Sequence, residues 1–569
     1  MLNVKYIIIS GGVLSGLGKG IITASLGLLL KSRGFKVTAF KCDMYLNIDA
    51  GTMNPLEHGE VFVTHDGLET DQDLGHYERF IDETLSRSNY ATNGQIYKSV
   101  LDKERSLEYK GACVQPYHHI PPEIIKRWEI AGREHKSDIV LIEMGGTVGE
   151  YEGLLFFEAA RRLKLKNPND ISFIHVGYLP APGNIGELKS KPLQQSVYFL
   201  NTMGIQPDFI VGRASKEVDT RRKEKIALAS GVPIENIISS PDLDSVYKVP
   251  LKLDEQGFAE LVFKKLGLKA KKKNLTGWIK LVNKINSVKK YINIAIVGKY
   301  QKTGDYVLED AYVSVIESLK HAGWNFSVNP RVKWVNSEDL EKVNDEEVKD
   351  IFEDINGIIV PQGWGIRGVE GKIKAVKFAR ENKIPYLGLC FGMQMAVIEF
   401  ARNVLGLKHA NSEEVDPESP YKVIHLMDKQ KDYLEKNKYG GTIRLGAWPC
   451  VVKKGTILES AYKKYGGVKS NPWYQPNPTF PLQIRNTKYQ ILVYERHRHR
   501  YEFNNEYKDK YEKNGLLISG LSPDGELVEA IELKDHPFFI GTQFHPEYIS
   551  RPLSPHPIFL SFLEACLKK

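Results

Sequence analysis

The chain has 569 residues, 42% of them apolar and 26% charged, which is ordinary for a globular protein and too many residues for a single hydrophobic core. Its 78 basic residues exceed its 70 acidic ones by only 8, an excess that small anionic ligands explain as well as a polyanion does. The five cysteines are scattered and form no C-x-x-C pair, which argues against a disulfide framework and a cysteine zinc site. The sequence shows no signal peptide and no apolar run of the roughly 18–20 residues that a membrane span needs, which argues against a membrane protein. We therefore expect a cytosolic location.

Short apolar runs alternate with amphipathic stretches over the first 265 residues or so. The runs are KYIIIS, KVTAF, DIVLIEMGG, ISFIHVG and DFIVGR. Strands that alternate with helices predict βαβ units and therefore an α/β domain built on a parallel sheet.

A glycine-rich loop, GGVLSGLGKG, follows the first of these runs and precedes a stretch with helical spacing. Such a loop lets backbone N–H groups and Lys19 approach phosphates at a helix N-terminus, whereas a tight turn without a ligand is the plainer alternative. The spacing departs from G-x-x-x-x-G-K-[ST], because five residues separate Gly12 from Gly18. Gly20 stands where a Ser or Thr hydroxyl would hold Mg²⁺.

The missing hydroxyl means that Mg²⁺ needs oxygen ligands from elsewhere. Asp71 and Asp73 are two residues apart and would face the same way if the chain there is extended. Glu143 ends the run DIVLIEMGG, at the strand end where doubly wound sheets bind ligands. A solvated carboxylate is the alternative for each of them.

A lysine-rich stretch, LKAKKKNLTGWIKLVNKINSVKKY, separates the two halves of the chain. Its apolar residues keep a helical period at Trp278, Ile279, Leu281 and Ile285. We interpret it as a solvated linker helix with a basic face rather than a segment that binds nucleic acid.

A second alternating series begins at Tyr291 and runs through NGIIVPQGWG and KIPYLGLCFGMQ to FIGTQFHPE. It predicts a second α/β domain. The boundaries that follow are 1–267 for the first domain, 268–290 for the linker and 291–569 for the second domain. A stretch rich in Pro, Gly and Tyr from about 460 to 490 is expected to be an irregular surface excursion.

The second domain carries a thiol version of the nucleophile elbow, G-x-C-x-G, around Cys390. A strand-to-helix turn would expose the sulfur at a helix N-terminus, which favours the thiolate. His545 could act as base and acid with Glu547 as its orienter. The Gly-rich turn in VPQGWGIRG could offer a backbone N–H to an oxyanion. An inert core cysteine is the alternative.

The alternating run RHRHRY, from Arg496 to Tyr501, predicts a strand with its arginines on one face. One arginine that binds a substrate carboxylate is favoured over a metal cage. From the residues alone, an ATP-type phosphate site joined to a thiol amidohydrolase indicates ATP-dependent amidation with ammonia as the nucleophile.

Together these strings resemble the CTP synthase family in collinear order over nearly the whole chain. The matching strings are SGGVLSGLGKG, NIDAGTMNPLEHGEVFVTHDGLETDQDLGHYERF, EMGGTVGEYE, GELKSKP, KIALAS, DSVYKVP, VGKY, GLCFGMQ, ANSEE, GGTIRLG, ERHRHRYEFN and QFHPE. HGEVFV together with DLGHYERF is the most specific pair.

The resemblance implies a P-loop-like, doubly wound parallel sheet similar to dethiobiotin synthetase, followed by a class I glutaminase domain. It implies that ATP phosphorylates O4 of UTP, that ammonia from glutamine travels through an internal tunnel, and that this ammonia displaces phosphate to give CTP. The implied effectors and cofactors are Mg²⁺, GTP as activator and CTP as feedback inhibitor. Homotetramers, with filaments in some members, are implied too, whereas nucleic acid and membrane partners are not.

The family's site residues carry over onto matching positions. For ATP these are Ser15, Gly16, Leu17, Gly18, Lys19, Gly20 and Asp73, with Asp73 and Glu143 as Mg²⁺ ligands. For UTP and CTP they are Ser15, Glu150, Tyr151, Glu152, Lys189, Ser190, Lys191, Pro192, Leu193, Gln194 and Lys225. For glutamine they are Gly363, Phe391, Gly392, Met393, Gln394, Glu414 and Arg500, and the catalytic set is Cys390, His545, Glu547 and Lys19.

Two departures from the family pattern stand out. Gln362 replaces the first glycine of P-G-G-F-G and is expected to restrict the turn of the oxyanion hole, and Leu193 replaces a threonine in the pyrimidine nucleotide segment, which should weaken a nucleotide contact. Three alternatives stay open: an amidase with another acceptor, such as a cobyrinic-acid-like one, a weakened scaffold or filament protein that binds nucleotide, and a partitioning-type ATPase that binds nucleic acid.

Overall fold

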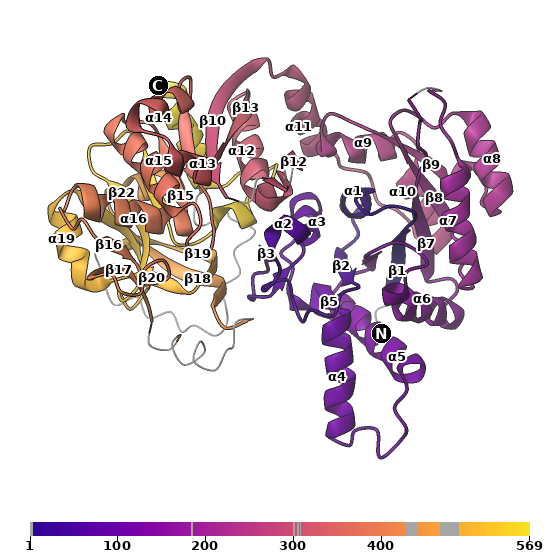
Figure 1. The fold of residues 1–569 in the computed structure, drawn as a ribbon. Coiled ribbons are helices and arrows are strands. Elements are labelled where there is room, and N and C mark those ends of the chain that lie inside the picture. Colours follow the sequence, from indigo (N-terminus) through magenta and orange to yellow (C-terminus); the bar gives the residue numbers. More distant parts are fainter. Residues whose placement is uncertain are drawn as a thin grey trace. The chain divides into compact units, whose positions relative to one another are not determined.

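The computed structural model describes residues 4–183, 186–299, 302–303, 306–307, 309–427, 430, 441–466 and 489–569. The chain forms two compact units (Figure 1). Unit 1 contains Met1–Asp49 and Asp73–Val282, and unit 2 contains Ala50–Gln72 and Asn283–Lys569. Most of the expected surface excursion, residues 467–488, lies outside the described residues. Within the described ranges, no helix is long and apolar enough to cross a membrane.

Unit 1 is built on a sheet of seven parallel strands in the order β5-β2-β6-β1-β7-β8-β9. The strands are β1 (Lys5–Gly11), β2 (Val37–Asp43), β5 (Tyr90–Thr92), β6 (Ile139–Met144), β7 (Ile171–Tyr178), β8 (Phe209–Ala214) and β9 (Ile237–Pro241). The five apolar runs of the first half form β1, β2, β6, β7 and β8, so the predicted parallel sheet is confirmed. β5 and β9 are additional.

Helices cover both faces of this sheet. They are α1 (Lys19–Lys31), α3 (Asp73–Ile81), α4 (Asn93–Arg105), α5 (Pro116–Glu134), α6 (Leu154–Lys166), α7 (Lys191–Thr202), α8 (Thr220–Ser230), α9 (Val249–Asp254), α10 (Phe258–Leu266) and α11 (Thr276–Ser287). On one face, Trp128 of α5 and Phe156 of α6 share a core with Ile142 of β6. On the other, Gly27 of α1 lies against Leu141, the neighbouring residue of the same strand. Because adjacent residues of a strand point to opposite faces, the sheet is doubly wound.

The predicted linker helix exists as α11, but it is docked on unit 1 rather than solvated on all sides. Trp278 is 2% exposed, its Nε1–H donates to the Tyr247 carbonyl at 2.8 Å, and its ring packs on that of Phe80. Lys280, on the opposite face, is exposed. The helix is therefore amphipathic: Trp278 and Leu281 of the predicted period are buried, whereas Ile279 is exposed together with Lys280.

Unit 2 has a mixed sheet of nine strands in the order β13-β10-β14-β15-β23-β22-β21-β18-β19. The strands are β10 (Lys290–Gly298), β13 (Val328–Asn336), β14 (Gly357–Val360), β15 (Tyr386–Leu389), β18 (Arg444–Lys453), β19 (Tyr489–His499), β21 (Leu516–Leu521), β22 (Val528–Leu533) and β23 (Phe539–Thr542). The first five in spatial order are parallel and the others antiparallel. The runs predicted as strands at the start of the second half form β10, β14 and β15.

The helices of unit 2 that matter for its site are α12 (Val313–Asn325), α15 (Val369–Glu381), α16 (Phe391–Asn403) and α20 (Pro557–Lys568). A smaller sheet is formed by β16 (Ala410–Ser412), β17 (Tyr421–Leu426) and β20 (Tyr501–Phe503). Together with the parallel half of the large sheet, this gives the α/β architecture that the sequence predicts for the second half.

Residues 50–72 come from the first half of the sequence but pack as part of unit 2. They contain α2 (Pro55–His58), β3 (Phe62–Val63) and β4 (Glu69–Thr70). The buried carboxylate of Glu60 accepts the backbone N–H of Ser314, at 3.1 and 3.2 Å for its two oxygens, and also the Ser314 hydroxyl. Ser314 lies in the first turn of α12, where a negative charge is stabilised by the helix.

We expect Glu60→Gln to weaken unit 2, because an amide offers one acceptor and no charge to the start of α12. The free energy of unfolding of this unit should fall by about 1–3 kcal/mol. Denaturant unfolding followed by a probe in unit 2 measures it, with the exposed Glu57→Gln in the same segment as the control. Equal midpoints for the two variants would contradict the anchoring role of Glu60.

Candidate functional site

The glycine-rich loop connects β1 to α1, at the carboxyl edge of the parallel sheet. Gly16 and Gly18 have φ angles of 69° and 82°, in the left-handed region that favours glycine. Gly18 precedes α1, and no side chain among the described residues caps the helix there. The first backbone N–H groups of α1 are therefore available to an anion.

Lys19 places its charge beside this loop. Its side chain is nearly buried, and Nζ donates to the Gly146 carbonyl at 2.8 Å. Burial lowers the pKa of Lys19, while the Glu143 carboxylate partly offsets that effect. Among the other predicted loop residues, Ser15 is exposed and Leu17 is buried.

Asp73 and Glu143, which are far apart in sequence, lie together around the Lys41 ammonium. Nζ of Lys41 contacts the carboxylate of Asp73 and lies 3.1 Å from Oε1 of Glu143. The other Glu143 oxygen accepts from the Tyr77 hydroxyl. Burial raises the pKa of Glu143; burial would raise that of Asp73 too, but the nearby Lys41 holds it below its usual value.

Gly20 is the position at which the expected metal-binding hydroxyl is missing, and the structure gives the reason for the glycine. A Cβ on residue 20 would collide with the carboxylate of Asp73. The Asp73 oxygens thus occupy the space that a Ser or Thr side chain would fill. The half-buried Asp73 carboxylate and the buried Glu143 carboxylate face one cation and form an oxygen-rich donor set of the kind that suits Mg²⁺.

Asp71 does not join this group. The chain turns into α3 at Asp73, so the two aspartates are not side by side on an extended strand. Asp71 belongs to unit 2 and lies 3.8 Å from Nε2 of His58 there. The condition under which Asp71 and Asp73 would face the same way, an extended chain, is therefore not met.

The predicted pyrimidine-nucleotide residues lie at the surface of unit 1, exposed or half-buried, except Ser190 and Leu193, which are buried. Glu150 accepts the N–H of Thr147 at 2.9 Å, and Tyr151 is 88% exposed. The segment Lys189–Gln194 enters α7, and Lys225 is exposed on α8, which packs against α7. Leu193 is fully buried in an apolar cluster, so only its backbone is left for a ligand.

The predicted elbow lies between β15 and α16. Cys390 has φ 52° and ψ −100°, a strained conformation that its surroundings hold in place. A Cβ on Gly392 would collide with the Val360 carbonyl, and one on Gly388 would meet the backbone of Gly392 at 2.8 Å. The backbone N–H of Cys390 donates to the Thr542 carbonyl at 2.6 Å, which joins the elbow to β23.

His545 and Glu547 follow β23, the strand next to β15. Nδ1 of His545 lies 2.8 Å from Oε1 of Glu547, and both side chains are fully buried. Burial would lower the pKa of His545, but the Glu547 carboxylate and the neighbouring Cys390 raise it to about 10. The imidazole is thus held in its charged form beside the sulfur. Tyr548 stacks on its ring at 4.9 Å between centroids.

A small pocket opens at the thiol. It is lined by Gln362, Gly363, Trp364, Cys390, Phe391, Gln394, Glu414, Arg498, His499, Arg500 and Tyr501. Five of the seven positions predicted for glutamine are in this lining. Gly392 and Met393 are not, because Gly392 lies against Val360 and Met393 is buried in the core.

Two buried lysines support the turn 361–365 beside the pocket. Nζ of Lys372 donates to the Pro361 carbonyl at 3.0 Å, and Nζ of Lys299 donates to the carbonyls of Trp364 and Gly365. Burial lowers the pKa of Lys299 to about 8. The Glu414 carboxylate accepts the Gly365 N–H at 2.6 Å. Gln362 is buried, and its Oε1 has no hydrogen-bond partner within the described residues.

Arg496 and Arg498 lie on one face of β19, as expected, and both contact the chain's own segment 50–72, whereas Arg500 follows the end of the strand at His499. Arg496 donates to the Val63 carbonyl at 3.0 Å, and Arg498 donates to Glu69 at 2.8 Å. Arg500 is left for the pocket, where it also donates to Thr442 at 2.9 Å.

Sequence reasoning missed several residues of these sites. Lys41 gave no signal, because a lysine inside a strand belongs to no motif. Trp364, Arg498, His499 and Tyr501 also line the pocket. Gln362 lines it too, although in the sequence it stands out only as a departure from the family's P-G-G-F-G pattern. Alternation along RHRHRY could have shown that the histidines share the face opposite the arginines.

Comparison with known proteins gives a consistent result for both halves. The family model described as CTP synthase N-terminus matches residues 5–268, and the one described as glutamine amidotransferase class-I matches residues 307–565. CTP synthase from Caldanaerobacter subterraneus is 51% identical over 99% of this chain and 98% of its own length, and that from Halalkalibacterium halodurans is 48% identical over the whole of both. Among solved structures, the glutaminase domain of Trypanosoma brucei CTPS with bound acivicin is 38% identical over 49% of this chain and 94% of its own, with a TM-score of 0.41.

We expect Gly20→Ala to weaken the binding of ATP with Mg²⁺ by about 10–100-fold, because a methyl group there displaces Asp73. Alanine favours the helix more than glycine does, so a loss cannot come from helix propensity. Isothermal titration calorimetry measures the affinity, and Gly183→Ala, in open space, is the control. Unchanged affinity in Gly20→Ala would show that Asp73 need not stay where it is.

Proposed function

The chain belongs to the CTP synthase family, and we propose that its residues divide the family's reaction between a synthase site at the Lys19 loop and a glutaminase site at Cys390. Members aminate UTP to CTP with ATP and glutamine. Because members of the family use UTP as the acceptor of the amino group, family membership favours UTP over the cobyrinic-acid-like acceptor. It also makes the chain an enzyme rather than only a scaffold. We propose the domain limits 1–267 and 291–569, with 268–290 as the linker.

The observation that carries the glutaminase proposal is the meeting of Cys390 with the His545–Glu547 pair at the ends of neighbouring strands, beside one pocket. Sγ of Cys390 attacks the carboxamide carbon of glutamine and forms a tetrahedral oxyanion. Backbone N–H groups of the elbow and of the turn 361–365 stabilise that charge. The His545 imidazolium gives its proton to the departing nitrogen, which leaves as ammonia and leaves a thioester on the sulfur.

Water then hydrolyses the thioester, with His545 now taking the proton, and glutamate leaves with the thiol restored. Glu547 holds the imidazole in orientation and stabilises its charge. In the pocket, the guanidinium of Arg500 suits the α-carboxylate of glutamine, and the Glu414 carboxylate suits its α-ammonium. The assignment rests on complementary charges on the pocket lining.

At the synthase site, the γ-phosphoryl group of ATP passes to O4 of UTP, ADP leaves, and ammonia displaces phosphate to give CTP. We propose that the backbone N–H groups of residues 15–20 and Lys19 hold the phosphates. Asp73 and Glu143 are the residues that would hold Mg²⁺, which supplies positive charge to the phosphates when bound. Lys41, between these carboxylates, keeps them together without the metal.

Residues 150–152, 189–194 and Lys225 are proposed for the pyrimidine nucleotide, with UTP and inhibitory CTP overlapping. We further propose, from the family resemblance, activation by GTP, passage of ammonia through an internal channel, a homotetramer and assembly into filaments. A cytosolic location suits an enzyme that uses these nucleotides. The feature that favours nucleic acid is the basic face of α11, a helix docked on unit 1.

Two substitutions test the division of labour. Cys390→Ala should lower glutamine-driven CTP synthesis by about 10³-fold or more while synthesis from free ammonia persists. Lys19→Ala should lower both by about 10²–10³-fold, because it removes a charge from the transferred phosphoryl group. CTP formation from each nitrogen donor is the measurement, with the exposed Cys113→Ala and with Lys31→Ala in the same helix as controls. Ammonia-driven synthesis by Lys19→Ala near the wild-type rate would refute the phosphate-loop assignment.

The pH dependence of glutamine hydrolysis tests the raised pKa of His545. The charged imidazole is present below its pKa of about 10 and is lost as pH rises through that value. In Glu547→Gln the pKa falls, so the alkaline limb of kcat/KM for glutamine should move to lower pH by about 1–3 units. Steady-state profiles from pH 6 to 10.5 measure it, and the exposed Glu506→Gln is the control. An alkaline limb at the same pH in Glu547→Gln and in the wild type would show that Glu547 does not raise the pKa of His545.

A further inference from the structure

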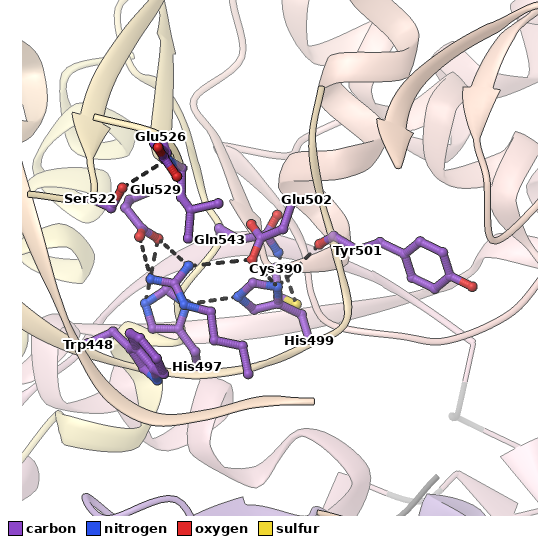
Figure 2. Close-up of polar contacts among 12 residues, drawn as sticks. Cys390, Trp448, His497, His499, Tyr501, Glu502, Ser522, Glu526, Glu529 and Gln543 are labelled. Carbon is purple, nitrogen blue, oxygen red and sulfur yellow. Dashed lines mark hydrogen bonds and ion pairs between the residues drawn. The ribbon is translucent and has the colours of Figure 1, made fainter. Parts of the chain in front are cut away.

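Two histidines beside the thiol are not used by the proposed chemistry. His497 and His499 are two residues apart on β19 and share the face opposite Arg498. Both are buried, and Nδ1 of His497 lies 2.9 Å from Nε2 of His499 (Figure 2). Glu529 lies at one end of this pair and the carbonyl of Tyr501 at the other.

The hydrogen atoms of the pair can be assigned from their partners. Nδ1 of His499 lies 3.2 Å from the Tyr501 carbonyl and 3.4 Å from Oε1 of Glu502; the carbonyl can only accept, so this Nδ1 carries the hydrogen. Burial and the Arg444 guanidinium lower the pKa of both histidines well below the usual value, so each ring is neutral. Nε2 of His499 is therefore an acceptor, and Nδ1–H of His497 donates to it. All the hydrogen bonds of the chain point toward Tyr501.

A group of buried charges lies at the far end of the chain of hydrogen bonds. Arg444 of β18 donates to both oxygens of Glu529, at 2.5 and 3.2 Å, and lies 3.5 Å from Oε1 of Glu502. Nε2 of His497 lies 3.6 Å from Glu529 and has no hydrogen-bond partner among the described residues. This group makes no hydrogen bond to His497 within the described residues and offers its Nε2 no proton donor.

The near end reaches the pocket through Gln394. The Tyr501 carbonyl also accepts from Nε2 of Gln394 at 3.1 Å, which settles the orientation of that amide. Nε2 of Gln394 lies 3.5 Å from Oε1 of Gln543, whose own Nε2 donates to Sγ of Cys390 at 3.6 Å. Oε1 of Gln394 is buried and has no partner within the described part of the chain, although the residue lines the pocket.

We propose that His497 and His499 are positioning residues for glutamine hydrolysis: their one-way hydrogen bonds fix the Tyr501 carbonyl and, through it, the amide of Gln394, which then presents its oxygen to the substrate. An oxygen at that place accepts an N–H of glutamine, whereas a flipped amide would oppose it with a second donor. The inference rests on the proposed glutaminase site and adds to it the residues that orient one of its walls.

Substitutions at His499 separate this role from packing. Asparagine places a donor where Nδ1 of histidine is, so His499→Asn should keep kcat/KM for glutamine within about threefold of wild type. His499→Leu fills space without a donor, and its kcat/KM should fall by about tenfold or more, mainly through KM, because one buried hydrogen bond and the amide orientation are lost. Synthesis from free ammonia should be unchanged in both, which shows that the rest of the enzyme is intact.

A double-mutant cycle supplies the deciding readout. If His499 acts through Gln394, then adding His499→Leu to a Gln394→Leu variant should not lower kcat/KM for glutamine any further. If the two substitutions cause independent packing defects, their fold-losses in kcat/KM should multiply. Equal kcat/KM for wild type and His499→Leu, or multiplied losses in the double variant, would overturn the proposal. If His499→Leu loses its ammonia-driven activity, His499→Gln is used in its place, because the longer glutamine side chain moves the amide away from the Tyr501 carbonyl. Wild-type kcat/KM in His499→Gln, or multiplied losses in its double variant with Gln394→Leu, would then overturn the proposal. Glutamine hydrolysis by Cys390→Ala would instead overturn the proposed site itself.

Discussion

Parallel strands end at one edge of a sheet, and this constraint places both sites of the molecule. In unit 1 the Lys19 loop follows β1 and Glu143 ends the neighbouring β6. In unit 2 Cys390 follows β15 and His545 follows the neighbouring β23. Residues that are about 120 and 155 positions apart in sequence become neighbours because their strands are neighbours in register. The chemistry of each site depends on that pairing more than on any single side chain.

Close contact at glycines refines what the strand ends provide. At residue 20 the absence of a side chain admits the Asp73 carboxylate, and at residue 392 it admits the Val360 carbonyl against the elbow. In each case another part of the chain uses the volume. The first loop departs from the usual phosphate-loop pattern for this reason: the Asp73 carboxylate of a different helix, α3, occupies the space beside Gly20, so a hydroxyl on α1 would be in the way.

The sequence predicts what local patterns control. The apolar runs of the first half are strands, G-x-C-x-G is an elbow, and the RHRHRY alternation puts Arg496 and Arg498 on one face of β19. What it could not predict depends on contacts across long stretches of chain. Nothing near Arg498 indicates that its partner is Glu69, 429 residues earlier, or that Lys41 lies between Asp73 and Glu143. Leu193 and Met393 stand at positions that the family resemblance assigns to its sites, yet their side chains are buried in hydrophobic clusters.

Segment 50–72 has a consequence for how this protein can be divided. The chain passes from one unit to the other at residues 49–50, 72–73 and 282–283, so no single cut in the polypeptide separates the units. A gene split near residue 290 would give a second product without Glu60, and α12 would begin with an unneutralised first turn. To encode the two units as separate subunits, the 23 codons for residues 50–72 would have to move into the second gene, and a new stop codon and start codon would not be enough. This favours a single gene for both activities.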